Sequence, residues 1–167
     1  IDPGTAFGTG MHETTQLCIR QLEKRVKKGE QVLDVGTGSG ILGIAALKLG
    51  AGHVRGTDLD ENAITAVGEN LASNQISPEQ FEVIQGNIID DKRIQDWAGY
   101  EAYDLVTANI LADVIIPLVD VIPAHLKKGG YFITSGIINM KEEAVKAAFA
   151  ANSAFEVEEI TYQGEWV

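Results

Sequence analysis

The chain has 167 residues, 45% of them hydrophobic, and carries a formal net charge of −11 at neutral pH. This length and apolar content predict one globular domain with its own core. The apolar runs fall short of the roughly 18 to 20 residues that span a bilayer, and the first residues lack the charged and apolar regions of a signal peptide, so we expect a cytoplasmic protein with no membrane partner. The acidic charge also disfavours direct binding of nucleic acid, because it repels phosphates.

The elements in chain order begin with a stretch rich in glycine and threonine, DPGTAFGTGMHETT at 2–15, which is either a flexible tail or a shaped loop. After it, apolar runs rich in β-branched residues alternate with segments of helical length. We expect strands at 31–36, 53–58, 81–86, 103–110, 131–136 and 155–162. We expect helices at 13–27, 40–50, 61–74, 114–127 and 140–151, and a weaker one at 92–98.

This alternation predicts an α/β fold with a doubly wound, mostly parallel sheet. The 31–36 run has little polar alternation, which is typical of a central strand that helices cover on both faces. Asp60 is a candidate N-cap for the third helix. We expect Gly129 and Gly130 to end the fifth helix, and Pro123 to kink that helix or move its start.

A glycine-rich loop follows the first predicted strand. The stretch VLDVGTGSGILGIAAL at 32–47 places Gly36, Gly38 and Gly40 between a buried strand and a helix. Glycines allow a sharp turn and a close approach of a ligand, and the free N–H groups at the start of the helix point at the same spot. The dinucleotide signature needs glycine at its sixth position, where this chain has Ile41, so the spacing disfavours NAD and FAD.

Polar residues end the next three strands. Asp58 ends the second strand, where an acidic side chain can accept hydrogen bonds from both ribose hydroxyls of a nucleoside and repel a phosphate. After the third strand, Asn87 can bond an adenine edge and Ile88 can cover the adenine face, although a simple polar turn explains them equally well. Asn109 ends the fourth strand beside the first, at the switch point where such sheets bind ligands.

Metal and covalent chemistry find no support in the sequence. Cys18 is the single cysteine, and its place in a helical pattern favours a small core residue over a reactive thiol. One cysteine and three scattered histidines do not supply a zinc site. No Ser/His/Asp or Cys/His constellation is visible from the spacing.

These motifs together resemble a known family. VLDVGTGSG with a later acidic strand end resembles the S-adenosylmethionine motifs of class I methyltransferases. DPGTAFGTGMHETT, GTGSGILGIAALKLGA, TDLDENAI and ANIL narrow the resemblance to the PrmA family, which methylates a large-subunit ribosomal protein, and they extend it over essentially the whole chain. The resemblance implies the seven-stranded Rossmann-like sheet of class I methyltransferases, here in truncated form.

The resemblance also implies roles for individual residues. Residues 1–15 become a shaped loop that covers the cofactor, S-adenosylmethionine, and Phe7 shields its sulfonium from water. Thr15 matches a cofactor-contacting threonine of the family, and Gly36 matches its motif glycine. Asp58 matches the ribose-binding acid, and Asn109 matches the asparagine that lies on the cofactor and substrate side. Gly38, Gly40 and Asn87 complete the expected cofactor site, and Thr9 and His12 are weaker candidates.

The family resemblance implies an activity and a substrate. It predicts transfer of methyl groups to lysine ε-amines and the terminal α-amine of the ribosomal protein, with Asn109 as the catalytic residue. Residues 16–167 would form the catalytic domain of a monomer, and the small substrate-recognition domain that precedes it in the family lies outside this sequence. The chain starts at Ile1 and ends at Val167 inside an alternating pattern, so we expect a segment of a longer protein.

Other functions remain open from the residues alone. A class I methyltransferase for a glutamine amide, a nucleobase or a small molecule would share the cofactor motifs, but those amide and base families usually carry Asn-Pro-Pro-aromatic where this chain has Asn109, Ile110, Leu111 and Ala112. A module that binds S-adenosylmethionine without catalysis would keep Gly36 and Asp58 but would not need Thr15 or Asn109. An NAD-binding domain is disfavoured by Ile41.

Overall fold

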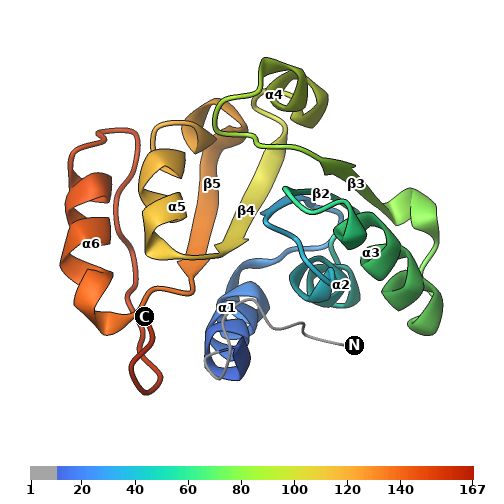
Figure 1. Ribbon diagram of the computed structural model, residues 1–167, viewed down its shortest axis with the longest axis horizontal. Coiled ribbons are helices and arrows are strands. Elements are labelled where there is room, and N and C mark those ends of the chain that lie inside the picture. The colour runs from blue at the N-terminus through green and yellow to red at the C-terminus, as the bar shows by residue number, and fades with distance from the viewer. Residues whose placement is uncertain (1–10) are drawn as a thin grey trace.

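The computed structural model describes residues 11–167, in which a parallel sheet lies between two layers of helices (Figure 1). In these residues the sheet has five strands in the order β3-β2-β1-β4-β5, each parallel to its neighbours. The strands are β1 (Gln31–Val35), β2 (His53–Asp58), β3 (Phe81–Gln85), β4 (Tyr103–Asn109) and β5 (Leu126–Ser135). The doubly wound α/β fold predicted from the sequence is confirmed.

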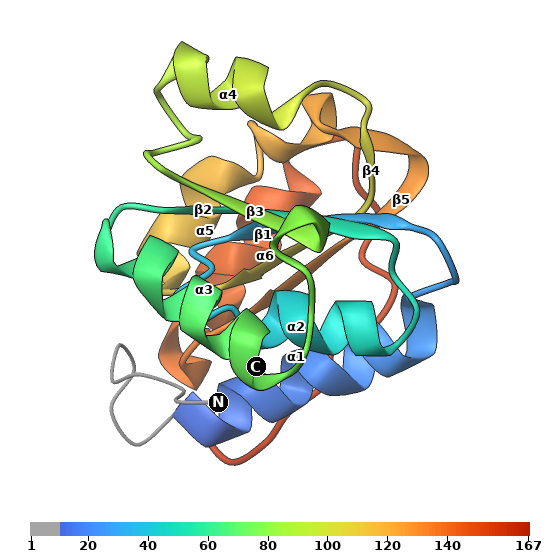
Figure 2. The same ribbon diagram turned by 90° about the vertical axis from the view of Figure 1, so that its right-hand side faces the viewer.

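Six α-helices cover the two faces of this sheet. They are α1 (Met11–Arg25), α2 (Ile41–Lys48), α3 (Asn62–Ser73), α4 (Lys92–Ala98), α5 (Ala112–Leu118) and α6 (Glu142–Ala150), among the described residues. Figure 2 shows α1, α2 and α3 together on one side of the sheet, with α4 on the other. None of the helices in residues 11–167 is long and apolar enough to cross a membrane.

The central strand β1 contributes to both hydrophobic layers, as its apolar run predicts. Val32 packs with α1, α2 and α3 on one face, and Leu33 and Val35 pack with α4 and α5 on the other. Successive side chains of a strand point to opposite faces, so a strand covered on both sides needs apolar residues at nearly every position. Asp34 is the exception, and it points to the same face as Val32.

Helix α3 shows why the helical periodicity predicted its place well. Its buried residues Ala63, Val67 and Leu71 recur every fourth position and face the sheet, while Thr65, Glu69 and Ser73 are exposed. The predicted N-cap, Asp60, is one residue too early, because Glu61 occupies the N-cap and makes no side-chain cap bond. The Asp60 Oδ1 still accepts a hydrogen bond from the Asn62 backbone N–H at 2.9 Å. This bond satisfies one of the donors that the first turn of a helix leaves unpaired.

The predicted helix at 114–127 is wrong in both its length and its end. Helix α5 ends at Leu118, and a separate 3-10 turn spans Ile122–Ala124 before β5 begins at Leu126. Pro123 lacks a backbone N–H and its ring collides with the preceding turn of an α-helix, so the helix cannot continue through it. Gly129 and Gly130 therefore lie inside β5 and not at a helix end.

The predicted strand at 155–162 is also wrong. These residues form no ladder, and the bridges nearby join Trp166 to Gln163 and to Ile138. Phe155 packs against Phe132, but Val157, which a strand would place on the same face, is 49% exposed. A strand also needs a neighbouring strand for its backbone hydrogen bonds, and within residues 11–167 this segment contacts β5 and α1 only through side chains.

Candidate functional site

The carboxyl ends of β1, β2, β3 and β4 border a cleft of about 500 Å³. The chain leaves β1 toward β2, and β4 lies on its other side, so the loops after β1 and β4 diverge and leave space between them. Each of the four strand ends contributes a predicted residue to the cleft wall: Gly36, Asp58, Asn87 and Asn109. The structure therefore brings these four residues together from positions 73 residues apart in the sequence.

The glycine loop after β1 forms the floor of this cleft. Gly36 has a φ of +71°, and a Cβ at this position would lie 2.6 Å from Cγ2 of Ile110 in the loop after β4. Only glycine allows this conformation and this close approach without strain. Gly38 is exposed and lines the cleft, whereas Gly40 is buried at the N-cap of α2, where its backbone packs toward α3.

Asp58 is oriented by two backbone donors. Its Oδ2 accepts the N–H of Gly38 at 2.8 Å, and its Oδ1 accepts the N–H of Asp60 at 2.9 Å. An ionised carboxylate offers about four acceptor positions, so two hydrogen bonds leave capacity for two more. The arrangement fixes the carboxylate at the cleft and leaves it able to accept the two hydroxyls of a ribose.

Asn87 and Ile88 follow β3 on the next wall. The Asn87 Oδ1 accepts the backbone N–H of Ile89 at 3.0 Å, which leaves the amide nitrogen as the group able to donate to a ligand. An amide donor matches the acceptor nitrogens of an adenine edge. Ile88 also lines the cleft, but it is only 1% exposed and forms part of the core beneath.

Asn109 is held between the sheet and helix α1. Its Nδ2 donates to the Thr15 Oγ1 at 3.4 Å, and both residues line the cleft. One residue earlier on α1, the Thr14 carbonyl accepts a hydrogen bond from the Ser135 hydroxyl of β5 at 3.0 Å. The start of α1 is thus fixed to the carboxyl ends of β4 and β5. The Asn109 Oδ1 is buried and has no hydrogen-bond partner within residues 11–167.

The charges around the cleft favour a cationic ligand. Among the described residues its lining includes Asp34, Asp58 and Asp113 and no lysine or arginine. An opposite charge is attracted into such a cleft, and a phosphate is repelled. Within residues 11–167 no group of three or more histidine, cysteine or acidic side chains could hold a metal ion.

The remaining candidates lie away from this cleft or outside the described residues. His12 is exposed near the start of α1 and does not line the cleft. Phe7 and Thr9 lie outside residues 11–167. Cys18 is fully buried in the core under α1, and burial raises the pKa of its thiol far above the usual range, which agrees with a core residue.

Comparison with known proteins decides the family. The sequence profile of the family described as "Ribosomal protein L11 methyltransferase (PrmA)" matches residues 1–167. The chain belongs to the PrmA family. The ribosomal protein L11 methyltransferases of Lachnospira eligens and Agathobacter rectalis are 61% and 56% identical to it. Each alignment covers all of this chain and 52% of the relative, so the chain spans about half the length of these relatives.

A solved structure supports the same conclusion. The chain is similar to the ribosomal protein L11 methylase of Lactobacillus delbrueckii subsp. bulgaricus, with a TM-score of 0.85 and 38% identity over 99% of this chain and 80% of that one. The predicted PrmA resemblance and the class I methyltransferase fold are confirmed.

Asp34 is among the polar residues of this cleft that sequence reasoning missed. Its carboxylate is 1% exposed and accepts hydrogen bonds from the hydroxyls of Thr37 and Thr107, each at 2.8 Å. Burial raises the pKa of Asp34 to about 6, the charge of Asp58 adds to the shift, and the two hydrogen bonds oppose it. The available signal was a single acid inside the apolar run VLDV.

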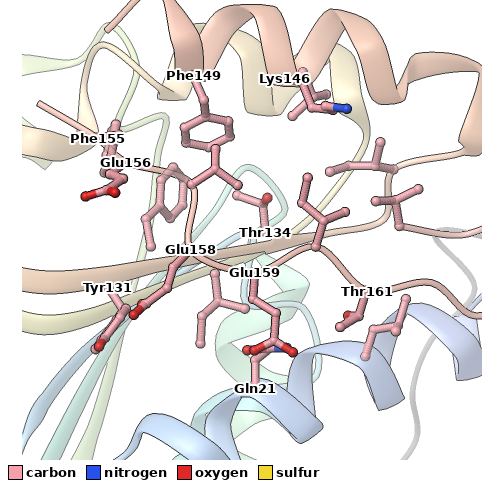
Figure 3. Close-up of a pocket in the computed structure, with 18 of the residues that line it drawn as sticks. Gln21, Tyr131, Thr134, Lys146, Phe149, Phe155, Glu156, Glu158, Glu159 and Thr161 are labelled. Atoms are coloured by element: carbon pink, nitrogen blue, oxygen red, sulfur yellow. The ribbon is translucent and has the colours of Figure 1, made fainter. Parts of the chain in front are cut away.

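A second cavity, of about 200 Å³, lies along the outer edge of β5, away from the glycine loop. Figure 3 shows its lining, with Phe149 and Phe155 close together and Glu159 beside Gln21. On its rim, Arg25 and Glu159 form an ion pair at 3.0 Å. The cleft at the carboxyl ends, where polar groups from four strands converge, is therefore the candidate functional site.

Proposed function

We propose that the protein containing this chain transfers methyl groups from S-adenosylmethionine to amines of ribosomal protein L11, namely lysine ε-amines and the N-terminal α-amine. Membership in the PrmA family supports methyl transfer and the identity of the substrate. The observation that carries the proposal is the buried Oδ1 of Asn109, which has no hydrogen-bond partner within residues 11–167 and lies beside a cleft lined by aspartates. An unpartnered buried oxygen is costly, so it marks a place where a donor of the substrate completes the hydrogen bonding.

The residues present fit the cofactor. In this proposal the carboxylate of Asp58 accepts the ribose hydroxyls, the amide of Asn87 donates to the adenine edge, and Gly36 and Gly38 let the backbone approach the ligand. The aspartates of the cleft favour a ligand that carries a positive charge. When bound, S-adenosylmethionine supplies a methyl group activated by its sulfonium.

Thr15 and Phe7 complete the proposed cofactor site. Thr15 lies on α1 at the cleft wall, bonded to Asn109. Phe7 belongs to the segment 1–15 that we propose to cover the bound cofactor, and residues 16–167 form the catalytic domain. We assign Gly40 to the support of the loop, since its buried backbone does not line the cleft.

The proposed chemistry at the acceptor is orientation and removal of a proton. A lysine amine has a reference pKa near 10.4 and must lose a proton before its lone pair can attack. Loss of water around the amine lowers that pKa, and so would the positive charge of the bound cofactor. The Asn109 Oδ1 then accepts one N–H of the neutral amine and aims its lone pair at the methyl group, and water carries the released proton away. This mechanism requires no histidine or carboxylate as a dedicated base.

The proposed substrate also indicates the compartment and the partner of the protein. A protein that modifies a component of the ribosome acts in the cytoplasm, and we propose that it does so as a monomer that recognises L11 and not nucleic acid. The net charge of −11 suits a partner of opposite charge.

One experiment tests this function. The full-length protein that contains this chain is incubated with labelled S-adenosylmethionine and undermethylated ribosomal protein L11, and the products are mapped by mass spectrometry. The proposal predicts label on lysine side chains and the N-terminal amine. Label confined to a glutamine or to RNA would contradict it.

A further inference from the structure

Asp34 is the central group of a buried polar cluster beneath the cleft. The Thr37 hydroxyl donates to its Oδ2 and the Thr107 hydroxyl donates to its Oδ1, each at 2.8 Å. All three side chains are at most 4% exposed. Thr37 belongs to the glycine loop between β1 and α2, and Thr107 belongs to β4. One carboxylate therefore joins the loop that lines the cleft to the strand that ends in Asn109.

The register of the sheet builds this cluster from three adjacent strands. Asp34 lies opposite Gly56 of β2 on one side and opposite Thr107 of β4 on the other. A Cβ at Gly56 would lie 2.9 Å from both Cβ and Oγ1 of Thr37. The absence of a side chain at Gly56 thus gives the Thr37 side chain its place above the sheet, within reach of Asp34.

Packing alone does not explain an acid at this position. The other residues buried in β1 are Val32, Leu33 and Val35, and an apolar side chain at position 34 would join the same core without a charge to desolvate. Buried charges that persist in a fold are held by hydrogen bonds, as this one is. A buried acid with a perturbed pKa in a cleft wall is characteristic of functional sites.

The two threonines divide the cluster into two arms with different consequences. Thr37 lies between Gly36 and Gly38, which line the cleft floor, so its position sets that of the cofactor loop. Thr107 lies two residues before Asn109 on the same face of β4, so its position sets where the Asn109 amide stands. The Thr15 contact at 3.4 Å is long and leaves the Asn109 amide dependent on its strand for placement.

We propose that Asp34 is a positioning residue for methyl transfer, whose carboxylate holds the cofactor loop through Thr37 and the acceptor-orienting strand through Thr107. This inference rests on the proposed function. In this proposal the loop contacts the methyl donor and the strand orients the amine. The hydrogen bonds of Asp34 to both therefore set the distance between donor and amine. Displacements of about 1 Å in such geometry reduce rates by about a hundredfold.

The two arms are tested separately in the full-length protein. Thr37→Val removes one hydroxyl without changing side-chain size, and we expect the Kd for S-adenosylmethionine to rise about tenfold while kcat on L11 changes less than about threefold. Thr107→Val is expected to lower kcat about tenfold or more with the Kd nearly unchanged. Serine at either position restores the hydroxyl and should restore the wild-type value. Thr134→Val is the matched control, because Thr134 lies on the neighbouring strand β5 and lines the outer cavity.

Several results would overturn the inference. They are equal changes in Kd and kcat for both valine variants, effects no larger than those of Thr134→Val, or a failure of serine to restore the lost value. Unfolding of either valine variant, measured by its thermal midpoint and circular dichroism, would also contradict it, because the cluster would then hold the fold and not the site. A wild-type protein that binds S-adenosylmethionine but does not methylate L11 would refute the proposed function instead. In that case calorimetry would still test whether Thr37→Val raises the Kd for S-adenosylmethionine.

Discussion

The buried carboxylate of Asp34 should make the stability of the protein depend on pH in a defined window. Its pKa is about 6 in the folded protein, against 3.8 for an aspartate in an unfolded chain, with burial as the largest cause. Between these two pH values the folded protein keeps the proton that the unfolded chain releases. The contribution of this group to the free energy of unfolding therefore falls as pH rises through the window. A shift of about two pKa units corresponds to a loss of about 3 kcal/mol.

The variant Asp34→Asn removes the titrating group and keeps an amide that can bond both Thr37 and Thr107. The free energy of unfolding of the variant minus that of the wild type should rise by about 3 kcal/mol between pH 3 and pH 7 and then level off. Urea unfolding of both proteins at steps of pH measures this difference. A carboxyl carbon resonance that titrates near pH 6 in the wild type and is missing from the variant gives a direct check. If the difference in the free energy of unfolding between variant and wild type does not change with pH, or falls, burial does not raise the pKa of Asp34.

Three further substitutions test the site and the fold. Asp58→Ala should weaken S-adenosylmethionine binding by about 10- to 100-fold in calorimetry, because hydrogen bonds to a charged acceptor contribute about 1.5 to 3 kcal/mol; an unchanged Kd would remove its assigned role. Asn109→Ala should lower kcat about a hundredfold and change the cofactor Kd far less, and equal losses in both would contradict its role in orienting the amine. Gly43→Ala should lower the free energy of unfolding by about 1 to 3 kcal/mol, since the new methyl group meets the ring of Phe81, and a more stable variant in urea unfolding would contradict that packing.

Local patterns predicted the parts of the fold that depend on local physics. The β1 run and the glycine loop were recognisable because a strand covered on both faces must be apolar and a sharp turn above a ligand must be glycine. The 155–162 segment has the alternation of a strand, but a strand also needs a neighbour, which a local pattern does not encode. The predicted end of α5 lay too late in the sequence, because apolar residues continue at helical spacing past Leu118 although Pro123 interrupts the helix.

The site likewise has one part that local patterns predicted and one part that they did not. Strand ends were predictable, so Asp58, Asn87 and Asn109 were expected at one edge of the sheet, and the structure places them in one cleft. The contact between Thr107 and Asp34, and the space that Gly56 leaves for Thr37, were not predictable, because both depend on the register of three strands. Cross-strand neighbours of this kind become visible only in three dimensions.

The most direct test of the account is a crystal structure of the full-length protein with S-adenosylmethionine bound. The account predicts the ligand in the cleft at the carboxyl ends of β1 to β4, with its ribose hydroxyls within hydrogen-bond distance of the Asp58 carboxylate and its methyl group facing Asn109. Density for the ligand in the outer cavity beside Phe149 and Phe155, or a cleft that stays empty at saturating ligand, would contradict it.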